Sequence, residues 1–107
     1  MKKAKKRNIL EAAVVVRSKN SGPFELTLDI MFKDRGYFDL FKERRIITAA
    51  RIARLYGVPR SDVLKVIYFE PSLAVKATLR RLVASGAPGD TDIYGAQQHA
   101  PLLGITF

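Results

Sequence analysis

The 107-residue sequence contains no cysteine, and this absence removes several classes of function. Without a thiol, the chain can form no disulfide, has no thiol nucleophile and cannot build a zinc site from thiolates. No stretch approaches the roughly 20 consecutive apolar residues that a helix needs to cross a bilayer. We expect no signal peptide in the basic and then apolar N-terminus, because Glu11 interrupts it and charged residues occupy the cleavage region. We therefore expect a cytoplasmic protein that does not enter a membrane.

Catalytic and cofactor motifs are equally scarce. The sequence has no nucleophile motif, no glycine-rich nucleotide loop and no paired-carboxylate pattern. A single histidine without cysteine beside it makes a poor metal site. Asp90 and Asp92 are not followed by further acidic ligands at loop spacing, and Asp90 suits a turn better. We expect no metal and no cofactor, and the sequence does not decide whether the chain is an enzyme.

Positive charge, in contrast, is in excess, with a formal net charge of +9. Five of these charges lie at the N-terminus, on Lys2, Lys3, Lys5, Lys6 and Arg7. Residues 33–65 hold a further nine Lys or Arg against four Asp or Glu. Such a pattern attracts nucleic acid or acidic partners, but without a nucleic-acid-binding motif a solvated basic surface is the simpler interpretation. We predict a basic, disordered tail at 1–8 and a single domain at 9–107.

The order of the expected elements predicts an α+β fold. We expect strands at residues 12–17, 24–32, 63–69, 74–81 and 102–107, and short helices at 37–42 and 48–56. Residues 63–69 are apolar on both faces, which predicts a central strand. Thr48 as N-cap and Gly57 after the last turn delimit the second helix, on which Arg51 and Arg54 are expected to face water. The simplest architecture is a two-layer sandwich, with a mixed or antiparallel sheet and two short helices on one face.

Strict alternation in the 24–32 strand separates an apolar face from a polar one. The apolar face carries Leu26, Leu28, Ile30 and Phe32, and the other face carries Glu25, Thr27, Asp29 and Met31. If helices cover the apolar face, the polar residues lie on an open face together with Lys76, Thr78 and Arg80 of the 74–81 strand. Such a face is either solvated or the floor of a site that another chain completes.

The only histidine, His99, follows Gln97 and Gln98 in a loop rich in glycine and proline. Because histidine titrates near neutrality, His99 is the first candidate for a general acid or base. The two amides suit a substrate carbonyl or carboxylate. The alternative is that all three side chains hydrogen-bond the backbone of their own loop.

Further candidates for binding a carboxylate or phosphate are Arg17, Lys19, Lys76 and Arg80. Lys19 and Asn20 end the first predicted strand, Asp29 lies on the polar face of the second, and the 89–99 loop returns across one end of the sheet. These side chains can therefore meet, although charges on an open sheet face are most often only solvated.

Three stretches resemble a known family: RSKNSGPFELTLDIMF at residues 17–32, ATLRR at 77–81 and GDTDIYGAQQHAPLL at 89–103. They are similar to an uncharacterised family, a domain of unknown function, of small proteins that accompany acyclic terpene utilisation proteins. The large acyclic terpene utilisation proteins themselves end in a small ferredoxin-like domain that opens with Arg-Ser-Gly-Asp-Lys-Gly. The string from Arg17 to Gly22 resembles this opening but lacks its acidic residue. The second resemblance implies a ferredoxin-like sandwich.

Together the resemblances imply a small accessory subunit of an acyclic-terpene-utilisation-like protein, with a shared site for a small carboxylate or acyl thioester. The expected roles are anion attraction by Arg17 and Lys19, orientation by Asn20 and Gln98, and proton transfer by His99 or Asp29. The alternative is a non-catalytic interaction or assembly module, and a basic nucleic-acid-binding protein is the least favoured interpretation. Homo-oligomer formation stays open.

Overall fold

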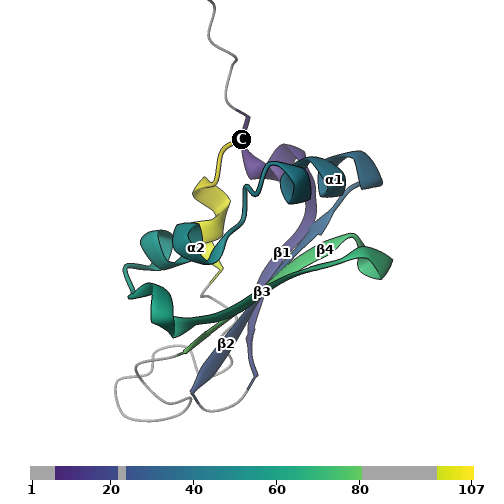
Figure 1. Ribbon diagram of the computed structural model, residues 1–107. Coiled ribbons are helices and arrows are strands. Elements are labelled where there is room, and N and C mark those ends of the chain that lie inside the picture. Colours follow the sequence, from purple (N-terminus) through teal and green to yellow (C-terminus); the bar gives the residue numbers. More distant parts are fainter. Residues whose placement is uncertain (1–6, 22–23, 81–98) are drawn as a thin grey trace, which may run out of the picture.

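Four strands form one antiparallel sheet in the order β1-β2-β4-β3, and the helices lie on one face of it (Figure 1). The strands are β1 (Ala13–Asn20), β2 (Glu25–Phe32), β3 (Val63–Phe69) and β4 (Ala74–Arg80), and the helices are α1 (Arg35–Glu43) and α2 (Ala49–Tyr56). This computed structural model describes residues 7–21, 24–80 and 99–107. The predicted α+β two-layer sandwich is confirmed. None of the helices within the described ranges is long and apolar enough to cross a membrane.

Two hairpins frame the helical layer. β1 pairs with β2 and β3 pairs with β4, and the hairpins join where β2 lies beside β4. The chain order is therefore β-β-α-α-β-β, as expected for these elements from the sequence. A ferredoxin-like sandwich shares the layers, but its chain alternates β-α-β units, whereas here both helices follow one another between the hairpins.

Two predicted elements were wrong. Residues 63–69 form an edge strand, not a central one, because β3 pairs only with β4 among the described strands. Residues 102–107 do not form a strand of the sheet: Ala100–Gly104 form the 3-10 helix η4, and Thr106 makes only an isolated bridge to Asn8. Pro101 has no backbone N–H to donate and fits the first turn of a helix, which favours η4 over a strand.

The ends of both helices follow from local capping. The Asp34 side chain accepts the backbone N–H of Tyr37 at the start of α1, and Thr48 accepts that of Arg51 at the start of α2. Gly57 ends α2 with φ 63°, a left-handed conformation that glycine adopts without a steric penalty. The N-cap predicted at Thr48 and the stop predicted at Gly57 are both confirmed.

The expectation that Arg51 faces water was wrong. Its guanidinium donates to the carbonyl of Ile46 over 3.2 Å and to that of Thr106 over 3.0 Å. The side chain is half-buried because it lies between the connection of the two helices and the C-terminal segment. Arg51 thus fixes the end of the chain onto the helical layer.

The core lies between the helices and one face of the sheet. Leu26, Leu28 and Ile30 of β2 are buried there, which confirms the apolar face predicted from the alternation. Phe41 of α1 is fully buried, with its ring 4.6 Å from that of Phe32 and 4.9 Å from that of Phe107, measured between centroids. This aromatic group joins the sheet, the first helix and the C-terminus in one cluster.

Tyr68 of β3 ties the edge strand to the connection between the helices. Its hydroxyl oxygen accepts a hydrogen bond from the backbone N–H of Ile47 over 3.2 Å. The hydroxyl donates to the carbonyl of Ile47 over 2.9 Å, and the carbonyl of Phe41 is a second acceptor at 3.3 Å. Burial raises the pKa of Tyr68, so the hydroxyl stays protonated and remains a donor.

We expect Tyr68→Phe to lower the free energy of unfolding by about 1–2 kcal/mol, because partly buried backbone groups lose their partner. Urea denaturation measures this difference. The matched control is Tyr37→Phe, whose hydroxyl contacts only the exposed Arg7 guanidinium, and which should change stability by less than about 0.5 kcal/mol. Equal effects of the two substitutions would show that Tyr68 does not fix the connection.

Candidate functional site

The face of the sheet opposite the helices carries most of the charged candidates. Residues directly opposite one another in antiparallel strands share a face, so the register defines this surface. The open face consists of Val15, Arg17 and Lys19 of β1, Glu25, Thr27, Asp29 and Met31 of β2, Ala74, Lys76, Thr78 and Arg80 of β4, and Lys65, Ile67 and Phe69 of β3.

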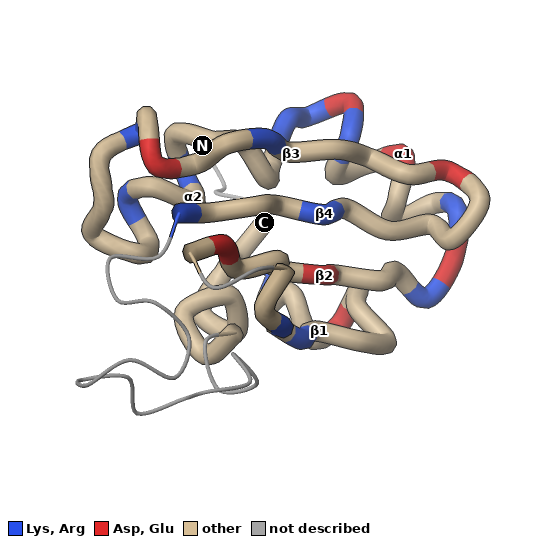
Figure 2. Tube along the Cα trace, turned by 90° about the horizontal axis from the view of Figure 1, so that it is seen from below, with Lys and Arg blue, Asp and Glu red and all other residues tan. Residues whose placement is uncertain are grey.

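Two neighbouring rows cross the middle of the open face. The aspartate row runs Arg17, Asp29, Lys76, Ile67 from β1 to β3, and the threonine row runs Lys19, Thr27, Thr78, Lys65. Figure 2 shows the alternation of basic, acidic and basic positions across β1, β2 and β4. Four cationic side chains therefore surround one carboxylate and two hydroxyls.

Asp29 is the unusual member of the open face, since it lies on a central strand and only 1% of its surface is exposed. Nε of Arg17 donates to its Oδ2 over 3.2 Å. Its other oxygen, Oδ1, is buried and has no hydrogen-bond partner among residues 7–21, 24–80 and 99–107. Lys76 lies directly opposite on β4, but its ammonium sits 5.8 Å from the centroid of the Phe69 ring.

The arrangement at Asp29 costs stability. A buried carboxylate loses its hydration and needs hydrogen-bond donors on both oxygens to recover it. The one donor it has comes from Arg17, whose side chain is 57% exposed, so solvent screens the attraction between the two charges. Such half-satisfied buried polar groups are uncommon in folded proteins, which makes Asp29 the residue of the open face to test first.

The structure brings four of the predicted site residues together, namely Arg17, Lys19, Asp29 and Lys76. Asn20 lies opposite Leu26, so it belongs to the helix-covered face and not to the open face. His99 directly precedes η4, and η4 packs against α2 and the 3-10 helix η1 (Ile9–Glu11) on the helical side of the sheet. Gln97 and Gln98 lie outside the described residues, as does most of the predicted 1–8 tail.

The contribution of β3 to the open face was not predicted from the sequence. Ile67 and Phe69 are each 45% exposed, and Lys65 completes the threonine row. A strand predicted to be central offers no exposed face, which is why these residues were overlooked. Lys65 in the middle of an otherwise apolar run was the available signal, because an unpaired lysine disfavours a position covered on both sides.

A second cluster lies near the N-terminal end of the described chain. The Arg7 guanidinium carbon lies 5.4 Å from the centroid of the Tyr37 ring and 5.2 Å from that of Phe107. An open pocket of about 410 Å³ is lined by Arg7, Asp34, Gly36, Tyr37 and Leu40. Its charged groups are already bonded, Arg7 to Glu11 and the Tyr37 hydroxyl, and Asp34 to the start of α1. This cluster therefore holds the helix and the chain terminus and offers little to a ligand.

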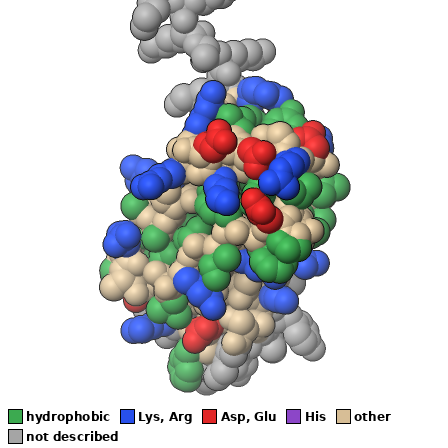
Figure 3. Space-filling view, turned by 45° about the vertical axis from the view of Figure 1, so that its right-hand side comes forward, with side chains coloured by type: hydrophobic (Ala, Val, Ile, Leu, Met, Phe, Trp, Pro, Cys, Tyr) green, Lys and Arg blue, Asp and Glu red, His purple; other side chains and the backbone are tan. Residues whose placement is uncertain are grey.

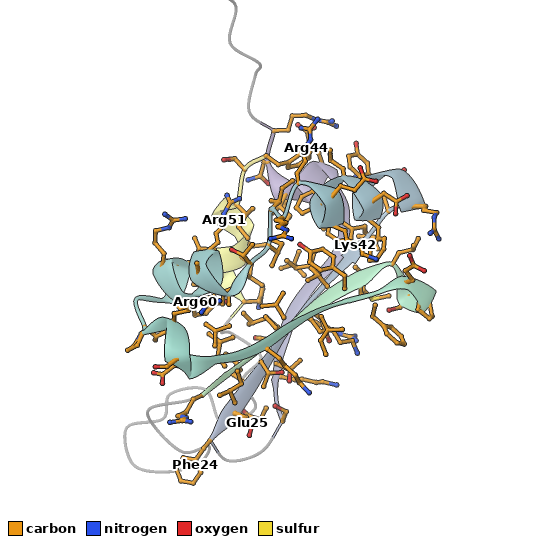
Figure 4. All side chains as sticks on the ribbon, viewed as in Figure 1. Phe24, Glu25, Lys42, Arg44, Arg51 and Arg60 are labelled. Atoms are coloured by element: carbon orange, nitrogen blue, oxygen red, sulfur yellow. The ribbon has the colours of Figure 1, made fainter. Side chains whose placement is uncertain are left out.

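The basic residues of the helical layer do not join the open face. Lys42, Arg44, Arg51 and Arg60 lie on the helical side, and Arg44 is at the opposite end of the molecule from Phe24 (Figure 4). Figure 3 shows basic and acidic side chains interspersed on the face of the molecule that it presents. Glu70, for example, lies 3.4 Å from an Arg35 nitrogen and 3.8 Å from the Lys42 ammonium. This layer has the mixed charge of a solvated surface, not the continuous basic stripe typical of nucleic-acid binding.

Metal-ligating side chains do not gather in the described part of the chain. Over residues 7–21, 24–80 and 99–107 no group of three or more His, Asp or Glu side chains is arranged to hold a metal ion.

The fold and the open face thus define a small two-layer α+β domain with a charged sheet face that none of the described helices covers. The chain belongs to the family described as "Domain of unknown function (DUF4387)", whose model matches residues 9–106. No curated protein and no solved structure matches it significantly. The resemblance to a family of unknown function is thereby confirmed.

Proposed function

We propose that this chain is a small accessory subunit whose open face docks on a larger protein and contributes residues to a shared site for a small carboxylate or acyl thioester. The larger protein is of the acyclic-terpene-utilisation type, as the sequence resemblance implies. The observation that carries the proposal is Asp29, which is buried on the open face with one carboxylate oxygen unbonded.

The composition of the open face supports both parts of this proposal. Arg17, Lys19, Lys65 and Lys76 supply cations for a carboxylate or phosphate, and the register holds them within two adjacent rows of the sheet. Charges on a rigid sheet hold their spacing better than charges on a loop, which favours binding of one small anion. Asp29 is the group in this ring that can accept a proton or a hydrogen bond from the ligand.

Apolar groups beside these charges support docking. Ile67 and Phe69 of the edge strand β3 lie on the open face and are both exposed. A patch of aromatic and aliphatic side chains rimmed by charges is typical of a surface that another protein covers. The same patch favours a second candidate function, a non-catalytic assembly module in which the charged rows only fix the orientation of the partner.

Co-purification with the larger protein tests docking. We expect the tagged larger protein to retain the wild-type chain, and the double variant Lys65→Glu/Lys76→Glu to be lost from the complex, because two reversed charges oppose the complementary surface. The matched control Arg44→Glu/Arg54→Glu reverses two exposed charges on the helical side and should bind like the wild type. Equal retention of both double variants would contradict docking through the open face.

A further inference from the structure

We propose that the anion site on the open face is specific for hydroxy carboxylates, whose hydroxyl donates to Oδ1 of Asp29 while the carboxylate is held by Lys76. This inference rests on the proposed function, since it names the ligand class for the same anion site. It concerns the chemistry of two opposed side chains, Asp29 and Lys76, on neighbouring strands.

The unbonded oxygen decides which kind of group the ligand must present. Oδ1 of Asp29 is buried and accepts no hydrogen bond from the residues that the structure describes, so a bound ligand gains most by donating one there. A cationic donor such as an ammonium is disfavoured, because Arg17, Lys19, Lys65 and Lys76 surround the position. A neutral hydroxyl supplies the donor without adding positive charge.

The ammonium of Lys76 favours a ligand that also carries a carboxylate. Lys76 forms no ion pair among the described residues, and its ammonium rests near the face of the Phe69 ring. Opposed Cβ atoms in antiparallel strands lie about 5 Å apart. A molecule with a hydroxyl one or two carbons from its carboxylate therefore spans from Asp29 to Lys76.

A ligand reaches Oδ1 of Asp29 only if the side chains around it move. The side chains flanking Asp29 include Arg17 and Lys76, which are long and exposed and can swing away without disturbing the core. Lys76 would leave the Phe69 ring to meet the carboxylate, and a cation–π contact at an exposed site is weak. An ion pair with the ligand replaces it at little cost.

Amide chemical-shift titration of the full chain with 3-hydroxybutyrate and with butyrate tests this inference. We expect the wild type to bind 3-hydroxybutyrate about tenfold more tightly, as one hydrogen bond to a charged acceptor predicts. The shifts should concentrate at Thr27, Thr78 and Lys76. In Asp29→Val the two acids should bind equally, and Lys76→Ala should weaken both.

Asp39→Asn, which changes an exposed carboxylate on α1, is the matched control and should keep the tenfold preference. If Asp29→Val does not fold, Asp29→Asn replaces it, and the preference should then fall without vanishing. Equal binding of both acids by the wild type, or no shift at the open face with either acid, would overturn the inference. Because the titration needs no partner, its failure is distinguishable from a failure of co-purification, which tests docking.

Discussion

Phe41→Ala should lower the free energy of unfolding by about 3–5 kcal/mol, the largest effect we expect from any single substitution in this chain. The ring is fully buried and packs against Phe32 of the sheet and Phe107 at the C-terminus. Truncation removes these contacts and leaves a cavity that three separate segments cannot close together. Because small domains are stable by only about 5–15 kcal/mol, the variant should be substantially unfolded at moderate urea concentrations.

Phe24→Ala is the control for this substitution, because it removes the same group from a side chain that is 57% exposed. Its effect on the unfolding free energy should stay within about 0.5 kcal/mol. Urea denaturation followed by circular dichroism compares the two variants directly. Similar losses in both would contradict the placement of the core between α1, β2 and the C-terminal segment.

Asp29→Val should stabilise the chain, in contrast to Phe41→Ala. We expect it to raise the free energy of unfolding by about 1–2 kcal/mol. The substitution removes a buried carboxylate oxygen that has no partner among the described residues. Valine also suits a central strand. Arg17 loses its ion pair, but its exposed guanidinium remains hydrated, so little is lost on that side. A gain in stability would show that Asp29 is retained for a reason other than folding.

Glu25→Val is the matched control, since Glu25 is an exposed carboxylate on the same strand and the same face. We expect it to change stability by less than about 0.5 kcal/mol. A clear loss of stability in Asp29→Val would mean that the Arg17–Asp29 pair is structural, and the functional interpretation of the open face would lose its main support.

Alternation and capping made much of the fold predictable from the sequence. The period of two in Glu25–Phe32 located β2 and separated its faces, because that strand has one dry side and one polar side. Thr48 and Gly57 bounded α2 through local hydrogen bonding and a left-handed backbone, which depend on few long-range contacts.

The errors arose where tertiary contacts decide the outcome. β3 was predicted to be central because apolar residues lie on both of its faces. In the structure Val66 and Tyr68 face the core, whereas Ile67 and Phe69 face outward. The sequence does not show that this outward side is left open. The C-terminal segment reads as a strand, but Leu102 and Ile105 bury themselves in the helical layer instead of extending the sheet.

The candidate site was only partly predictable from the sequence. The alternation in residues 24–32 and 74–81 predicted that Asp29 and Lys76 share a face, and the register that sets Arg17 and Lys19 of β1 beside them was seen only in the structure. What the sequence did not reveal is that Asp29 is buried with an oxygen that no described residue bonds, since burial at an open-face position depends on the tertiary structure. The separation of Asn20 and His99 from this face likewise follows from packing and not from local pattern.

Lysine footprinting of the complex with the larger protein tests the central claim most directly, that the open face is the functional surface. Acetylation with a small reagent reports the accessibility of each lysine, and the chain carries its own controls. We predict that complex formation protects Lys19, Lys65 and Lys76 on the open face, while Lys42 on the helical side stays as reactive as in the free chain. Protection of Lys42 with unchanged labelling of the three open-face lysines would contradict the account.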